Sequence, residues 1–286
     1  MKIKRNFAIL YLAFIFLMIG LNSCGDTDKS QAELENSEAN TNSQITDNYQ
    51  TQDTVQHANQ IERDTIVYDS LIFPNENYMT KVLTIGVFHG DEVSENSDKK
   101  DWFGLFLSKQ ENYIARTKIK MKRVYDPVLD EENEKTGWEI STYNKDSCII
   151  LIEKIQILSE KKIQKIEFQN TIYPKDTVTI NYLGIKYKIF ATGGGAKGGS
   201  VWNYKLFISA NIKGENRKSL LIAAPNFDDT MTSILFAGDI DGDGILDLII
   251  DTSRKYGGVN PTIYLSKPAS NGEILKPIGE ISSVGC

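Results

Sequence analysis

Short apolar and β-branched runs, separated by polar turn residues, recur along most of the chain after residue 65. The clearest pattern is in residues 117–124, where Lys118, Lys120 and Lys122 alternate with Ile119 and Met121. Alternation with a period of two residues predicts a half-exposed strand with a basic outer face. Further strands are predicted at residues 82–88, 102–107, 148–157, 163–168, 177–182, 185–192, 202–212, 219–223, 233–237, 246–251 and 262–265.

No segment of convincing length shows the period of an amphipathic helix. Residues 159–162 are expected to form a turn or a short helix. The pattern therefore predicts an all-β fold of mainly antiparallel sheets, sandwich-like or partly propeller-like, with minor helix at most. The 286 residues are enough for one large domain or two small ones. We place a boundary at Pro174, between an N-terminal β-rich subdomain (65–174) and a C-terminal one (175–286). A continuous sandwich is equally compatible with the pattern.

The first 23 residues follow a different pattern. A short basic segment precedes the apolar run 7–21, which is shorter than the roughly 20 residues that a membrane span requires. The run ends in Leu21-Asn-Ser-Cys24, which resembles the lipobox of a bacterial lipoprotein signal peptide. The resemblance implies that Cys24 is lipidated and becomes the first residue, although Asn22 is an unusual occupant. The alternative is an ordinary secretory signal peptide in which the cysteine is coincidental.

Residues 24–64 are rich in Asn, Ser, Thr, Gln, Asp and Glu, which predicts a disordered acidic tether. Residues 1–23 hold three basic residues, so the mature chain keeps 29 basic and 38 acidic residues, a net charge of −9. Residues 24–65 account for −7 of this charge, with nine acidic and two basic residues. The remainder is nearly neutral, and nothing in it suggests the basic patch of a nucleic-acid-binding protein.

The most informative stretch is Asp239-Ile-Asp-Gly-Asp-Gly-Ile-Leu-Asp247. Its four carboxylates, on Asp239, Asp241, Asp243 and Asp247, offer the hard oxygen ligands that calcium accepts in loose geometry. The Ile245 carbonyl is a further candidate ligand, and the two glycines allow the loop to fold its ligands inward. The alternative is a solvated acidic turn that holds no metal.

Apolar runs on both sides of this stretch predict two strands, so the loop joins a β-hairpin. The helices of an EF-hand are missing, and its twelfth position is Ile250. Residues 236–250, Phe-Ala-Gly-Asp-Ile-Asp-Gly-Asp-Gly-Ile-Leu-Asp-Leu-Ile-Ile, instead resemble a single repeat of the FG-GAP/VCBS type. This resemblance implies a calcium-binding β-hairpin. Members of the family usually carry several copies that form propeller blades, and this chain has one.

Two other stretches invite chemical interpretations. Gly193-Gly-Gly-Ala-Lys-Gly-Gly-Ser200 is rich in glycine, but the Gly-Lys-Ser/Thr order of a phosphate-binding loop is absent, so we predict a flexible hairpin loop. His89 could serve as a catalytic base, but Asp91 is too close in sequence to be an obvious orienting partner. A histidine at a loop end with acidic neighbours is more often a surface feature. Paired carboxylates for glycoside hydrolysis remain possible.

Cys148 and Cys286 are the thiols left if Cys24 is lipidated. In an oxidising compartment two cysteines suggest a disulfide that would join the C-terminus to the earlier subdomain. The alternative is that Cys148 lies buried in an apolar strand as a free thiol.

These observations predict a lipid-anchored lipoprotein of the cell envelope, at the outer membrane or cell surface, with one bound calcium ion. We expect its β-rich body to be a non-enzymatic binding or structural module. Its partners would be the membrane, through the anchor, and a protein or glycan that the sequence does not specify, but no nucleic acid. Two alternatives are a hydrolase of envelope or environmental polysaccharide and an inhibitor or accessory subunit of a surface complex.

Overall fold

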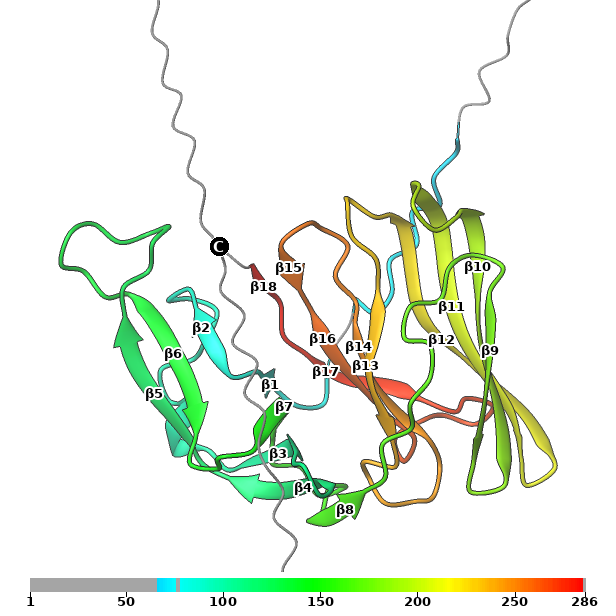
Figure 1. Cartoon of the computed structure of the whole chain (residues 1–286), viewed down its shortest axis with the longest axis horizontal. Coiled ribbons are helices and arrows are strands. Elements are labelled where there is room, and N and C mark those ends of the chain that lie inside the picture. Colours follow the sequence, from blue (N-terminus) through cyan, green and yellow to red (C-terminus); the bar gives the residue numbers. More distant parts are fainter. Residues whose placement is uncertain (1–65, 76–77, 285–286) are drawn as a thin grey trace, which may run out of the picture. The chain divides into compact units, whose positions relative to one another are not determined.

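The computed structural model describes residues 66–75 and 78–284, which belong to one compact unit. The predicted signal peptide and tether, with Cys24, lie outside the described residues, as does Cys286. The regular secondary structure of the described part consists of antiparallel strands and one short 3-10 helix, which confirms the all-β prediction (Figure 1). No helix in this part is long and apolar enough to span a membrane.

The first half of the described chain forms two sheets and one short 3-10 helix, Ser97–Lys99. The larger sheet has five strands, in the order β1 (Val82–Leu83), β7 (Ser147–Glu153), β3 (Trp102–Leu107), β4 (Asn112–Thr117) and β8 (Lys161–Ile163). The smaller has three, in the order β2 (Gly86–Phe88), β6 (Gly137–Thr142) and β5 (Ile119–Val124).

The second half forms two four-stranded sheets and a short two-stranded ladder. One sheet, here called the long-stranded sheet, has the order β12 (Glu215–Asn226), β11 (Val201–Ile212), β10 (Ile185–Gly195) and β9 (Thr177–Tyr182). The other, called the middle sheet, has the order β13 (Ser233–Gly238), β14 (Asp247–Asp251), β16 (Pro261–Leu265) and β17 (Lys276–Glu280). The ladder pairs β15 (Gly258–Val259) with β18 (Ser283–Val284).

The middle sheet contributes to two hydrophobic cores, because successive side chains of a strand point to opposite faces. One face, with Phe236, Ile249 and Ile263, packs with the buried residues of the first half. The opposite face, with Leu248 and Tyr264, packs with the long-stranded sheet. The first core therefore draws residues from both sides of position 174. The middle sheet lies between the sheets of the first half and the long-stranded sheet (Figure 1).

Most predicted strands are present, and some boundaries differ. Residues 102–107, 177–182 and 233–237 are strands as predicted. The predicted strand 163–168 is wrong beyond Ile163, where β8 ends. Residues 164–168 are not in a strand, although Ile166 N–H donates to the Ala237 carbonyl of β13 (2.9 Å). Residues 161 and 162, expected in a turn or short helix, belong to β8 instead.

The glycine-rich stretch 193–200 lies at a hairpin, as expected, but the loop itself is residues 196–200, because residues 193–195 belong to β10. Gly195 at the end of β10 pairs with Val201 at the start of β11. A side chain at Gly194 would collide with the Trp202 indole, 2.3 Å from the position of its Cβ. This glycine is therefore explained by close packing between the two strands.

Candidate metal centre

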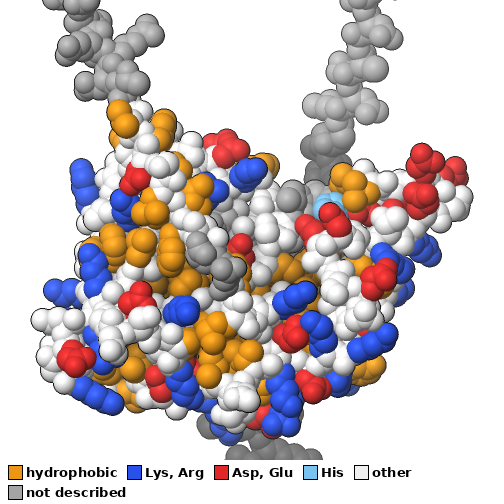
Figure 2. Space-filling view, turned by 180° about the vertical axis from the view of Figure 1, so that it is seen from behind, with side chains coloured by type: hydrophobic (Ala, Val, Ile, Leu, Met, Phe, Trp, Pro, Cys, Tyr) orange, Lys and Arg blue, Asp and Glu red, His pale blue; other side chains and the backbone are white. Residues whose placement is uncertain are grey.

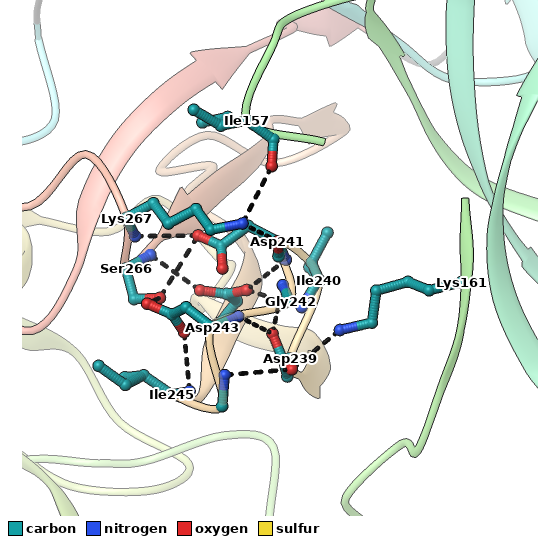
Figure 3. A network of polar contacts seen from close by, with 12 residues as sticks. Ile157, Lys161, Asp239, Ile240, Asp241, Gly242, Asp243, Ile245, Ser266 and Lys267 are labelled. Carbon is teal, nitrogen blue, oxygen red and sulfur yellow. Dashed lines mark hydrogen bonds and ion pairs between the residues drawn. The ribbon is translucent and has the colours of Figure 1, made fainter. Parts of the chain in front are cut away.

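The acidic loop joins β13 to β14, which pair antiparallel with Gly238 opposite Asp247. The strands on both sides confirm the predicted hairpin. Gly242 and Gly244 have φ values of 86° and 83°, a left-handed conformation that residues with a Cβ adopt at a cost. The loop can therefore turn twice within a few residues and direct its aspartates inward (Figure 3).

Asp247 lies at the base of the loop and is fully buried. Its Oδ2 accepts hydrogen bonds from the N–H groups of Ile240 (2.6 Å) and Asp241 (3.0 Å), and its Oδ1 accepts one from Ser266 N–H (2.8 Å). These three bonds from main-chain N–H groups fold the loop around the Asp247 carboxylate.

Asp241 is 1% exposed and has one oxygen that is not hydrogen-bonded. Its Oδ2 accepts from Lys267 N–H (2.9 Å) and lies 3.4 Å from the Ser266 hydroxyl. Its Oδ1 is buried and has no hydrogen-bond partner among the described residues. A buried carboxylate oxygen without a partner loses its hydration without compensation, and such groups are rare in folded proteins.

Asp239 is held at the side of the loop, with its side chain 13% exposed. Its Oδ1 accepts from the N–H groups of Gly242 (2.6 Å) and Asp243 (3.1 Å). Its Oδ2 pairs with the Lys161 ammonium of β8 (2.8 Å). One oxygen each from Asp239, Asp241 and Asp247 lies within 4.8 Å of the others. Three carboxylates at this separation can hold a metal ion.

The other two predicted ligands are placed differently. Asp243 is exposed, and its Oδ2 accepts a hydrogen bond from the Ser266 hydroxyl (2.9 Å). Its Oδ1 accepts from Ile245 N–H (2.8 Å), so both residues sit at the rim of the cluster. Ser266 and Lys267, which follow β16, bind the loop carboxylates, and no motif in the sequence pointed to them.

Burial and mutual repulsion make the charged form of this cluster costly. Burial raises the pKa of Asp247 well above its usual value, and the nearby Asp241 carboxylate raises it further. Burial likewise raises the pKa of Asp241, with further contributions from Asp243 and Asp239. Nearby positive charge comes from Lys161 and from Lys267, whose ammonium is bonded to the carbonyls of Asp241 and Ile157 (3.4 Å to Ile157) (Figure 3). A cation among the aspartates would relieve their repulsion directly.

Comparisons with protein-family models, curated proteins and solved structures gave no match.

Of the two cysteines in the predicted disulfide, the structure describes only Cys148. Cys148 lies in β7, is buried, and has its Sγ 3.4 Å from the Ile150 carbonyl. Burial raises the pKa of its thiol to about 12, so the reactive thiolate is disfavoured at neutral pH. Because Cys286 lies outside the described residues, the disulfide stays a prediction.

His89 has an orienting partner that the sequence did not reveal. Its Nδ1 lies 2.7 Å from Oδ2 of Asp126, which is 1% exposed, although the two residues are 37 positions apart. The nearby Glu92 accepts a hydrogen bond from His89 N–H (2.8 Å). The pair fixes the loop after β2 against the loop after β5.

Proposed function

We propose that this chain is a lipid-anchored protein of the cell envelope whose β-rich body is a calcium-stabilised, non-enzymatic binding or structural module. The observation that carries the calcium part is the unpartnered Oδ1 of Asp241 within a buried group of three aspartates. A bound cation supplies this oxygen with the partner that it lacks, and it offsets the charge of the cluster.

Calcium is favoured over other metals by the ligands. The cluster offers carboxylate oxygens alone, whereas zinc and copper sites in proteins usually include histidine or cysteine. Magnesium requires a tight octahedron and usually keeps several waters, while calcium tolerates an irregular shell of protein oxygens. The likeness of residues 236–250 to FG-GAP/VCBS hairpins supports the same choice, with Asp243 and the Ile245 carbonyl as further candidate ligands at the rim.

The proposed role of the ion is structural, because the loop contacts elements from both neighbouring layers. Lys161 of β8 binds Asp239, and the Ile157 carbonyl accepts a bond from Lys267. On the other side, Leu246 N–H donates to the Tyr187 hydroxyl of β10 (3.2 Å). A cation that fixes the loop would thereby fix contacts among three parts of the fold.

The anchoring part of the proposal is supported by the N-terminal sequence. A basic start, an apolar run and Leu21-Asn-Ser-Cys24 have the order of a lipoprotein signal peptide. Several acyl chains, each contributing about 0.8 kcal/mol per buried methylene, would hold the chain stably at a membrane.

A hydrolase is the alternative, and its carboxylates would have to converge in a cavity. Three glutamates line a cavity of about 590 Å³ beside β1 and β17. Glu153 is ion-paired with Lys100 (2.7 Å), and Glu280 accepts a hydrogen bond from the Tyr78 hydroxyl (2.7 Å). The third, Glu92, is bound to the main chain at His89. Each glutamate thus has a structural partner, which favours the binding or structural module.

The calcium part is tested by thermal unfolding of the chain with added calcium, magnesium or a chelator. A ligand that binds only the folded state adds about 2.7 kcal/mol at 100 times its dissociation constant. The melting temperature should rise with millimolar calcium, fall with the chelator and change far less with magnesium. Asp241→Asn should remove most of the calcium response, whereas Asp228→Asn, in an exposed loop, should retain it. Wild-type protein that shows neither a calcium-dependent shift nor a heat of binding would exclude the site.

A further inference from the structure

The outer face of the long-stranded sheet, opposite the core, carries four lysines, of which Lys205 alone forms an ion pair with a described residue, Asp69. Alternation along β9 to β12 turns Lys186, Lys188, Lys205 and Lys218 outward, and no outward-facing residue of the stretches 177–181, 186–192, 205–211 and 216–220 is Asp or Glu. On the side of the molecule drawn in Figure 2, Lys and Arg side chains lie among Asp and Glu side chains. This basic face is therefore a local asymmetry in a nearly neutral body.

Three of these lysines lie together and lack anionic partners. Lys188 and Lys218 flank Ser209 on neighbouring strands, so their Cα atoms are about 10 Å apart. Lys186 is two residues from Lys188 along β10, a distance of about 7 Å. All three are exposed, and none forms an ion pair with a described residue. Unpaired like charges at this separation repel one another.

The lysines surround a shallow depression of about 400 Å³. Its other lining residues are Ser209, Ala210, Asn211, Asn216 and Arg217, and no acidic residue is among the described residues that line it. The hydroxyl and amide groups can exchange hydrogen bonds with hydroxyl groups of a ligand. The depression therefore combines cations with neutral polar groups.

The same face already holds one carboxylate from an extended segment. Asp69 lies against Lys205 of β11 (2.6 Å), and Asp69 N–H donates to the Asn203 side chain (2.7 Å). The Asn203 amide in turn donates to the Val67 carbonyl (2.8 Å). This contact shows that a lysine on this face can bind a carboxylate of a neighbouring segment.

We propose that Lys186, Lys188 and Lys218 bind an acidic polysaccharide, one whose carboxylate or sulfate groups recur along a hydroxyl-rich chain. A ligand with several anionic groups is needed, because the cations are spread over about 10 Å. This site lies on a different sheet from the acidic loop, so the proposal does not depend on calcium.

Other polyanions match the face less well. An extended peptide usually binds by pairing its main chain with a free sheet edge. Lys186 and Lys188 lie on β10, a central strand that is already paired on both sides, and of the three lysines Lys218 alone lies on an edge strand, β12. Single-stranded nucleic acid needs open aromatic surfaces for stacking. Here the rings of Phe190 and Phe207 stack on each other, are half-buried, and have the Lys218 ammonium 4.0 Å from the Phe207 ring centre.

Binding is tested by calorimetry on residues 24–286 with Cys24→Ser, using polygalacturonate and dextran sulfate as probes and neutral dextran as the blank. The variant is Lys186→Ala/Lys188→Ala/Lys218→Ala. Each lost contact is a modest exposed ion pair, so the triple variant should weaken binding by about threefold to 150-fold. Binding should also weaken as salt is raised. The result should be the same with calcium and with chelator at a temperature where both forms are folded.

A matched control removes three other exposed lysines, Lys118, Lys122 and Lys162, which are ion-paired with Asp101, Glu139 and Glu111. It changes net charge equally and should bind as wild type does. Replacing the three proposed lysines by arginine keeps their charge and should retain binding. Retained binding in this variant would show that the alanine variant lost its charged contacts and did not simply misfold. Equal loss in both alanine variants would overturn the proposal. So would an absence of binding, or tighter binding of polyglutamate, single-stranded DNA or anionic vesicles.

Discussion

Asp126 shows how a single buried carboxylate can favour the charged form of a residue that is distant in the sequence but adjacent in the fold. Its Oδ1 accepts hydrogen bonds from the N–H groups of Val128 (3.0 Å) and Leu129 (3.3 Å), while its Oδ2 faces His89. Burial opposes the charged form of Asp126, but these hydrogen bonds outweigh it, so its pKa is lowered. The hydrogen bond to this carboxylate in turn raises the pKa of His89 above 6.5.

The pH dependence of stability follows from the direction of the His89 shift. Because the folded pKa is above the unfolded one, the contribution is fully present below about pH 6.5 and is lost as pH rises through the folded pKa. In Asp126→Asn the pKa of His89, measured by NMR, should fall toward 6.5. The stability difference between wild type and variant should be larger at pH 5.5 than at pH 9.

The assignment is secured in a His57→Gln background, since the chain has two histidines. An unchanged His89 pKa in Asp126→Asn would contradict the expected role of the carboxylate.

At this scale the sequence identifies residue types better than it identifies their partners. The loop from Asp239 to Asp247 was recognisable because its spacing is local. The partner Lys161 comes from β8 and Ser266 from the turn after β16, and Asp126 lies 37 residues from His89. Contacts of this kind depend on how the sheets pack, which a local pattern does not encode.

Among the elements, β14 has the most demanding position. It is paired with β13 on one side and β16 on the other, and its side chains point into both cores. The apolar run that forms it is nearly continuous, as is typical of a strand that is buried on both faces. Such strands were predicted well. Edge and irregular segments, such as residues 164–168, were predicted less well. Whether such a segment joins a sheet depends on the strand that lies beside it in the folded protein, which its own sequence does not specify.

Ile249→Ala should destabilise the fold strongly. Ile249 is fully buried in the first core, and removing several buried methyl and methylene groups from such a site costs about 2–5 kcal/mol. Leu235→Ala, on the adjacent strand β13 but 37% exposed, should cost less than about 1 kcal/mol. Chemical denaturation of both variants gives the comparison, and similar losses would show that β14 is not central to the core.

On the scale of the whole molecule, membrane attachment is expected to depend on one residue. Cys24→Ala should release the protein from membranes, because the lipid chains and not the apolar run 7–21 would anchor it. Fractionation after high-salt and carbonate washes measures this. A processed variant that stayed with the membranes would contradict the lipoprotein proposal.

The two remaining cysteines give a second test at this scale. Mass spectrometry of non-reduced protein should find the peptides of Cys148 and Cys286 joined. Closing a loop of about 140 residues would stabilise the fold by several kcal/mol in the chain-entropy model. Free thiols at both positions in protein taken from the envelope would rule the disulfide out.

The middle sheet also determines when the chain can fold during its synthesis. Its strands follow those of both neighbouring layers in the chain and so leave the ribosome after them, yet Phe236, Ile249 and Ile263 complete the first core and Leu248 completes the second. Until about residue 280 has emerged, the apolar faces of both earlier parts lack their cover, and such surfaces invite chaperones or aggregation. Completion of both cores therefore has to wait for the synthesis of the middle sheet, even though most of the strands that it covers precede it in the chain.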